Sequence, residues 1–145
     1  MKAITIHQPW ATLIALGEKQ FETRSWATKY RGKIAIHAAK KIDRDACQIE
    51  PYKSVLAKHG YTSDNLPTGS IVAICDLSEC YQVRSSNHHL ATIGDPTNVV
   101  IGNEYEFGWY EPGRYAWELS DVQKIYPIPA KGQQGLWNWG GKRDV

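Results

Sequence analysis

Charged side chains of opposite sign crowd together in the stretch GEKQFETRSW, residues 17–26 of this 145-residue chain. Side chains alternate along a β-strand, so Glu22, Arg24 and Trp26 would share one face while the residues between them face the core. Lys19 stands at the start of the stretch and has a stem long enough to reach that face. Arginine and lysine bind phosphate groups, and a carboxylate accepts hydrogen bonds from the exocyclic amines of bases. The stretch therefore predicts either a nucleotide-binding site or an exposed ion pair worth at most about 1 kcal/mol.

An apolar helix is predicted directly before this stretch. One helical face is formed by Trp10, Leu13, Ile14 and Gly17, the last of which would end the helix. Pro9 suits the first position of a helix. Because the helix carries almost no charge, it must be covered by other parts of the protein, and its junction with the charged strand should lie in a crease. Trp10 and Trp26 flank that junction, where each indole either stacks on an unpaired base or packs into the core.

Further β-rich segments predict an α+β domain. The clearest are KIAIHAA at 33–39, SIVAICDLSECYQV at 70–83 and YAWELSDVQKIYPI at 115–128. Residues 43–59 have a helical composition, which Pro51 should split into two short helices. Because few helices separate the strands, a small, closed or nearly closed barrel is favoured over a doubly wound parallel sheet. Residues 84–113 are loop-like, with at most one short strand around residues 99–101.

Length and composition predict a single globular domain over residues 1–145, large enough for one core. No apolar run approaches the roughly 20 residues of a membrane-spanning helix, and the N-terminus lacks the apolar region of a signal peptide. We therefore expect a cytoplasmic protein that does not bind membranes.

The three cysteines form no CxxC pair, and no His/Asp cluster has ligand spacing. Neither a metal nor another cofactor is expected.

Basic and acidic residues are separated along the chain. Residues 19–58 contain ten Lys/Arg and four Asp/Glu, whereas residues 59–123 contain two and nine. The basic part is a source of positive potential suited to phosphates. Its turn SWATKYRGK, which includes Arg31, is either a contact for a nucleic-acid backbone or a solvated hairpin tip. The acidic part leaves open a protein-interaction module that docks a basic partner through residues such as Glu104 and Glu106.

The stretch IHQPWATLIALGEKQFETRSW resembles the start of an ASCH domain (activating signal cointegrator homology), a branch of the PUA-like barrels. The family motif GxKxxExR stands here as Gly17, Lys19, Glu22 and Arg24. The similarity continues, in the same order, through QPW at 8–10, RG at 31–32, IHAAK at 36–40, IVAICDL at 71–77, YAW at 115–117 and PAKGQQGLW at 129–137. It covers essentially the whole chain, with weak matching only across residues 41–65 and 84–113.

The resemblance implies an α+β fold: a small PUA-like mixed β-barrel with a short N-terminal helix packed at the barrel and one or two further short helices. It also implies a cleft beside the first helix and the second strand, lined by the motif, that recognises single-stranded RNA or a modified nucleoside. The residues predicted to bind this ligand are Gln8, Trp10, Lys19, Glu22, Arg24, Trp26, Arg31, His37 and Lys40.

Some members of the family are hydrolases, associated with the deacylation of N4-acetylcytidine or the cleavage of RNA. A metal-independent hydrolase is therefore the alternative function, with Lys19 shuttling a proton and Glu22 and Asp76 as acidic partners. In the deacylating branch a Thr nucleophile stands where this chain has Glu22, and Asp76 is one methylene shorter than the later glutamate that it matches. Deacylation by the same route is therefore disfavoured.

RNA cleavage has simpler requirements than deacylation, because the 2′-hydroxyl of the substrate can act as the nucleophile. Arg24 would stabilise the crowded phosphate, and His37 or Lys40 could assist from the strand expected to neighbour the motif. The alternative for His37 is a buried barrel histidine whose hydrogen bonds are satisfied within the fold.

Overall fold

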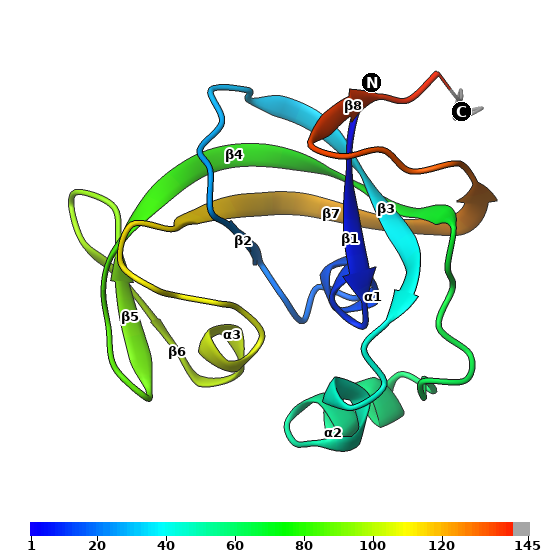
Figure 1. The fold of residues 1–145 in the computed structure, drawn as a ribbon, viewed down its shortest axis with the longest axis horizontal. Coiled ribbons are helices and arrows are strands. Elements are labelled where there is room, and N and C mark those ends of the chain that lie inside the picture. The colour runs from blue at the N-terminus through cyan, green and yellow to red at the C-terminus, as the bar shows by residue number, and fades with distance from the viewer. Residues whose placement is uncertain (141–145) are drawn as a thin grey trace.

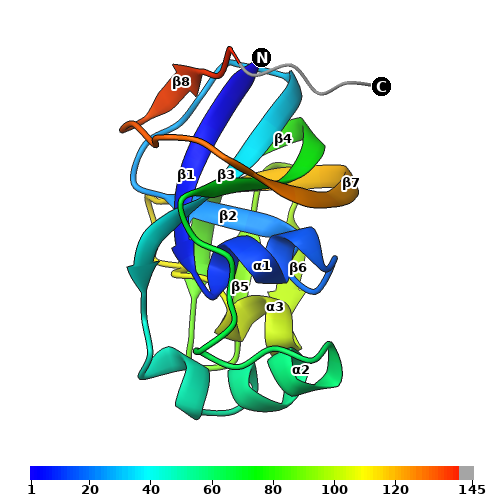
Figure 2. The same ribbon diagram turned by 90° about the vertical axis from the view of Figure 1, so that its right-hand side faces the viewer.

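The elements anticipated from the sequence form one mixed sheet covered by short helices. The computed structural model describes residues 1–140, which contain eight strands and three α-helices (Figures 1 and 2). In chain order these are β1 (Lys2–Gln8), α1 (Trp10–Ala15), β2 (Phe21–Arg24), β3 (Gly32–Ile42), the 3-10 helix η1 (Ala46–Gln48), α2 (Tyr52–Lys58), β4 (Ser70–Ser86), β5 (Leu90–Ile93), β6 (Asn98–Ile101), α3 (Gly102–Glu106), β7 (Tyr115–Pro129) and β8 (Leu136–Asn138). The predicted α+β class is confirmed.

The strands follow the order β2-β7-β4-β3-β1-β8, and the β5–β6 hairpin pairs with the far end of β4. β1 and β3 are parallel, whereas the other pairs are antiparallel. Between residues 1 and 140 no strand pairing joins β2 to β1 or β8. The sheet is therefore curved but not a closed barrel, which corrects the closed form of the prediction.

The two longest strands, β4 and β7, give the sheet its curvature (Figure 1). Their register shifts between Ile74 and Asp76 and again between Leu77 and Glu79. Such irregularities bend a strand and increase its local twist. They fall on residues 74–79, near the middle of β4. β4 stays paired with β7 as far as Gln82, and its last residues, Val83 to Ser86, pair with β5 of the β5–β6 hairpin.

The apolar helix α1 is covered, as its lack of charge predicts. Five of its six residues are buried, and Ile14 belongs to the main hydrophobic cluster together with Ile36 and Trp117. The helix stops before Gly17, whose φ of 76° is a conformation that other residues adopt only with strain. This turn after α1 sets the direction of the chain that leads to β2.

Three other segments test the sequence-based assignments. Pro51 does separate η1 from α2, as predicted. Residues 84–113, predicted as loop with at most one strand, instead contain β5, β6 and α3. Near the C-terminus, Trp137 and Trp139 are both buried in a cluster with Ala3 and Ile71. Within residues 1–140, no helix is both long and apolar enough to cross a membrane.

Candidate functional site

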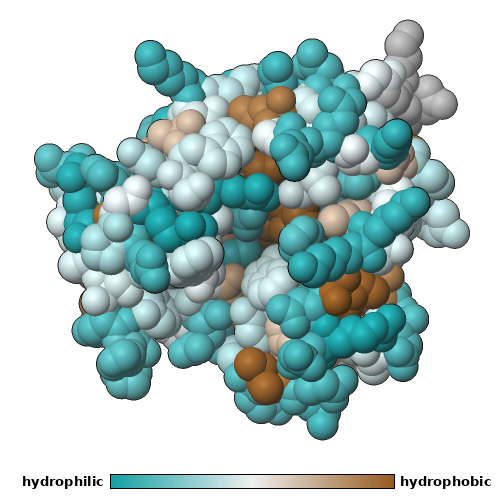
Figure 3. All heavy atoms as spheres, in the orientation of Figure 1, coloured by the Kyte–Doolittle hydropathy of each residue, from teal (hydrophilic) through white to brown (hydrophobic). Residues whose placement is uncertain are grey.

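A cleft of about 550 Å³ opens beside α1 and β2, in the crease that the sequence predicts. Figure 3 shows that this face of the molecule is hollowed near its centre. The charged residues that line the cleft are Lys19, Glu22, Arg24 and Arg114, and the aromatic ones are Trp10, Trp26, Tyr52, Phe107 and Trp109. Its volume lies within the range of about 300–1,000 Å³ that small-molecule sites occupy.

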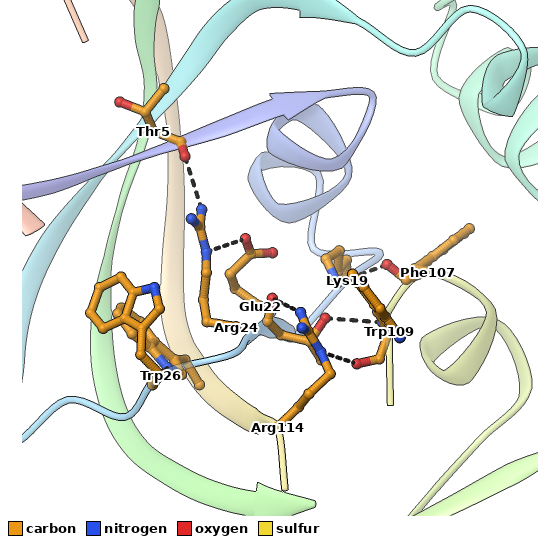
Figure 4. A network of polar contacts seen from close by, with 10 residues as sticks. Thr5, Lys19, Glu22, Arg24, Trp26, Phe107, Trp109 and Arg114 are labelled. Carbon is orange, nitrogen blue, oxygen red and sulfur yellow. Dashed lines mark hydrogen bonds and ion pairs between the residues drawn. The ribbon is translucent and has the colours of Figure 1, made fainter. Parts of the chain in front are cut away.

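Glu22 and Arg24 lie on the same face of β2 and contact each other directly. Nε of Arg24 donates a hydrogen bond of 2.9 Å to Oε2 of Glu22 (Figure 4). Nη2 of the same guanidinium donates to the backbone carbonyl of Thr5 on β1, also at 2.9 Å. Only 8% of Glu22 is exposed, so this contact neutralises a carboxylate that has little access to water.

Lys19 lies in the connection between α1 and β2 and is 1% exposed. Its Nζ donates a hydrogen bond of 2.9 Å to the backbone carbonyl of Phe107 (Figure 4). Burial lowers the pKa of Lys19, and the negative charges of Glu22 and Glu104 oppose that shift only in part. The cleft thus contains an amine that loses its proton more readily than an exposed lysine.

The segment after α3 forms the other wall of the cleft. The backbone N–H of Trp109 donates to Oγ1 of Thr23 at 2.9 Å, and Nε of Arg114 donates to the Trp109 carbonyl at 3.0 Å. The Arg114 guanidinium also lies 4.0 Å above the Trp109 indole. Although it is fixed in this way, Trp109 remains 58% exposed at the rim of the cleft.

Trp10 and Trp26 both line the cleft but are held differently. Nε1 of Trp10 donates to the Tyr52 hydroxyl at 3.1 Å, which ties α1 to α2. Trp26 is 37% exposed and packs edge-on against the buried Trp117, with ring centroids 4.8 Å apart. Trp26 therefore combines a fixed orientation with an accessible surface.

Comparison with known proteins shows which family the chain resembles. The family model of the ASCH domain matches residues 4–129. The chain belongs to the ASCH domain family. It is 32% identical over 142 residues to activating signal cointegrator 1 of Homo sapiens and 23% identical over 142 residues to that of Mus musculus. Each match covers 96% of this chain but 22% of the relative, so the ASCH domain described here spans about a fifth of those proteins.

A solved structure, the crystal structure of ASCH from Zymomonas mobilis, is also similar. The similarity covers 88% of this chain and 72% of that one, with a TM-score of 0.49 and 15% sequence identity.

The structure separates the predicted site residues of this ASCH domain into two groups. Five line the cleft: Trp10, Lys19, Glu22, Arg24 and Trp26. The other five do not line it: Gln8, Arg31, His37, Lys40 and Asp76.

Gln8 is fully buried, and its side chain is occupied within the fold. Its Oε1 accepts a hydrogen bond from the backbone N–H of Thr12 at 2.9 Å. Its Nε2 donates to Oγ1 of Thr12 at 2.6 Å and to the carbonyl of Pro67 at 2.7 Å. Gln8 therefore fixes the first turn of α1, and it does not line the cleft.

Arg31 and Asp76 form surface ion pairs elsewhere in the ASCH domain. Arg31, on the connection between β2 and β3, is exposed and lies 3.7 Å from Glu79. The Asp76 carboxylate lies 3.5 Å from Nζ of Lys33. Neither contact reaches the cleft, so Asp76 is not positioned to assist Lys19.

His37 and Lys40 are separated from the motif by the order of the strands. From the sequence their strand is expected to neighbour the motif, but β7 and β4 lie between β2 and β3. His37 and Lys40 instead line a second cavity on the other flank of β1. Their predicted assistance to Arg24 within the cleft is therefore not supported by the geometry.

Four of the charged and aromatic residues that line the ASCH cleft are not predicted from the sequence: Tyr52, Phe107, Trp109 and Arg114. Trp109 lies in the segment 84–113, which the sequence predicts as loop, and Arg114 directly follows that segment; both come more than eighty positions after the motif. The only sign of Trp109 and Arg114 in the sequence is a tryptophan in a polar segment, followed shortly by an arginine. Among the described residues, no group of three or more His, Cys, Asp and Glu could hold a metal ion.

Proposed function

We propose that this ASCH domain binds single-stranded RNA or a modified nucleoside, with one base in the cleft. The observation that supports this function is a single hollow that contains one buried carboxylate, three cationic side chains and exposed indoles. These are the parts that recognition of an unpaired base requires, namely a polar edge, a surface for stacking and positive charge near the phosphates.

Each part of the cleft has a specific role in this proposal. In the part of the chain that the structure describes, the hydrogen bonds of the Glu22 side chain involve only Oε2, so Oε1 can accept from an exocyclic amine of a base. Trp109 offers an exposed indole, and Thr23 holds its backbone N–H. Arg24 is already used by Glu22 and Thr5, and its role is to orient the carboxylate and attract phosphate.

Substitution of Trp109 tests the function with little disturbance of the core, since this side chain is exposed. Fluorescence anisotropy of a labelled single-stranded RNA hexamer should show that Trp109→Leu weakens binding by about 1–3 kcal/mol, because one stacking contact is lost. N4-acetylcytidine added as a competitor reports whether a modified nucleoside occupies the same site.

The matched control for Trp109→Leu is Tyr126→Leu. Tyr126 is 91% exposed and does not line the cleft, so its loss should leave the affinity for RNA unchanged. If neither RNA nor the nucleoside binds to the wild type, or if both variants lose affinity equally, the proposal is wrong.

A metal-independent hydrolase is a second candidate, and the state of Lys19 favours it. Burial lowers the pKa of this amine, as general acid–base catalysis near neutral pH requires, and Glu22 lies in the same cleft.

The purified, metal-free protein would be incubated with single-stranded RNA and with N4-acetylcytidine. Turnover that is abolished by Lys19→Met but retained by Lys53→Met, a change on the exposed face of α2, supports an enzyme. Binding without turnover supports the first function.

A further inference from the structure

A second cavity of about 850 Å³ lies between β3, the end of β7 and the glycine loop, which is the segment AKGQQG at residues 130–135. Figures 1 and 2 show this loop crossing β3 and β1 on its way to β8. The polar residues that line the cavity include Lys40, Lys131, Gln133 and Gln134, and no Asp or Glu of residues 1–140 lines it. The cavity thus offers two positive charges and two amides without a competing carboxylate.

The imidazole of His37 lies at the floor of this cavity and is 2% exposed. Its Nε2 lies 2.7 Å from the carbonyl of Ala130. Because a carbonyl only accepts hydrogen bonds, Nε2 carries the hydrogen and donates it. Nδ1 is buried and has no hydrogen-bond partner in residues 1–140. The glycine loop covers this atom, so His37 holds the loop in place, and contacts to a ligand would come from the other residues that line the cavity.

The glycine loop is fitted closely to this imidazole. A Cβ atom at Gly132 would lie 2.9 Å from Nδ1 of His37 and 2.8 Å from Oγ1 of Thr5. Only glycine lets the backbone approach so near without displacing either side chain. The glycine loop, which forms one wall of the cavity, is therefore packed directly against His37.

Thr5 connects the second cavity with the cleft, since it lines both. Its backbone carbonyl accepts from Arg24 on the side of the cleft, and its Oγ1 accepts from Nε1 of Trp137 at 3.1 Å. Thr5 is also in register with His37 on the neighbouring strand. The two hollows thus lie on the two flanks of β1, with one residue between them.

We propose that the second cavity binds phosphate groups of the single strand whose base occupies the cleft. The inference rests on the proposed function for the identity of that strand. The anionic ligand itself follows from the lining of the cavity: Lys40 and Lys131 supply point charges, and Gln133 and Gln134 supply amide donors. A strand that passes over Thr5 would place a neighbouring phosphate beside these groups.

Inorganic pyrophosphate is the probe that tests the anion site without involving a base. Titration calorimetry should detect binding to the wild type and its loss in the double variant Lys40→Gln/Lys131→Gln. The control, Lys53→Gln/Lys124→Gln, removes the same charge from exposed lysines outside the cavity and should bind pyrophosphate as the wild type does. Absence of binding to the wild type, or equal binding by the two double variants, overturns the inference.

Salt dependence of RNA binding then tests whether the anion belongs to a strand. The slope of log K against log salt should fall by about 1.4 in Lys40→Gln/Lys131→Gln, since each phosphate contact on a single strand contributes about 0.7. Binding of N4-acetylcytidine, which has no phosphate, should not change. An unchanged slope with intact RNA binding overturns this inference and leaves the proposed function standing. Pyrophosphate binding without any RNA binding overturns the proposed function and, with it, the strand as ligand.

Discussion

Arg24 on β2 donates a hydrogen bond of 2.9 Å to the backbone carbonyl of Thr5 on β1. Within residues 1–140 these two strands are not paired, so the side chain joins two strands that the sheet leaves apart. The same guanidinium holds the buried carboxylate of Glu22. The arginine of the family motif therefore contributes to the structure of the cleft as well as to its charge.

Arg24→Met should lower the free energy of unfolding by at least about 1.5–3 kcal/mol, the usual contribution of one hydrogen bond to a charged group. Two such bonds are lost, and Glu22 is left buried without its partner. Urea denaturation measures the effect. Arg31→Met is the control, because its exposed ion pair with Glu79 should contribute less than about 1 kcal/mol. Equal losses in both variants would show that Arg24 does not join the strands.

Glu104 is predicted to stabilise the fold and not to serve as a free acidic contact for a partner. Its carboxylate accepts hydrogen bonds from the backbone N–H groups of Gln20 and Phe21, at 2.7 and 3.2 Å. Glu104→Ala leaves these two donors at the start of β2 unpaired and should cost about 1–3 kcal/mol in urea denaturation. Glu106→Ala, two positions away and exposed, should have little effect. If both variants are as stable as the wild type, the Glu104 carboxylate is not needed for the fold, and the hypothesis that the acidic segment docks a basic partner is favoured instead.

Local periodicity explains which parts of the site could be predicted from the sequence. The alternation of side chains along a strand is enough to place Glu22 and Arg24 on one face, and their hydrogen bond confirms that placement. Gly17 and Pro51 likewise end or divide helices through their own backbone preferences. These features depend on a few neighbouring residues, which a single sequence displays directly.

Features that depend on pairing between distant segments could not be predicted in this way. His37 was expected beside the motif, but the pairing of β2 with β7 places two strands between them. Trp109 reaches the cleft through a hydrogen bond with Thr23, 86 positions earlier in the chain. Neither relationship leaves a periodic signal, because both are set by the packing of the whole sheet.

The buried amine of Lys19 should make stability depend on pH. Its pKa is lowered from the ordinary value of 10.5, chiefly by burial, so the unfolded chain binds more protons than the folded one between the two values. The free energy of unfolding should therefore rise with pH through that range. Measured from roughly pH 7 to pH 10, the stability of the wild type should rise relative to that of Lys19→Met. Lys53→Met, which alters an exposed lysine, should follow the wild type; a constant difference between wild type and Lys19→Met would contradict the assignment.

Gly132→Ala tests how closely the glycine loop is fitted to the second cavity. The new Cβ would lie 2.7 Å from Cε1 of His37, whose ring is held by its hydrogen bond to Ala130. Because neither the imidazole nor the loop can move without losing that bond, the substitution should lower the free energy of unfolding by about 1–3 kcal/mol. Gly140→Ala is the matched control, since a Cβ there meets no heavy atom within 4 Å. Thermal or urea denaturation that finds the two variants equally stable would mean that the loop is not packed against His37, and the buried Nδ1 would then be open to water.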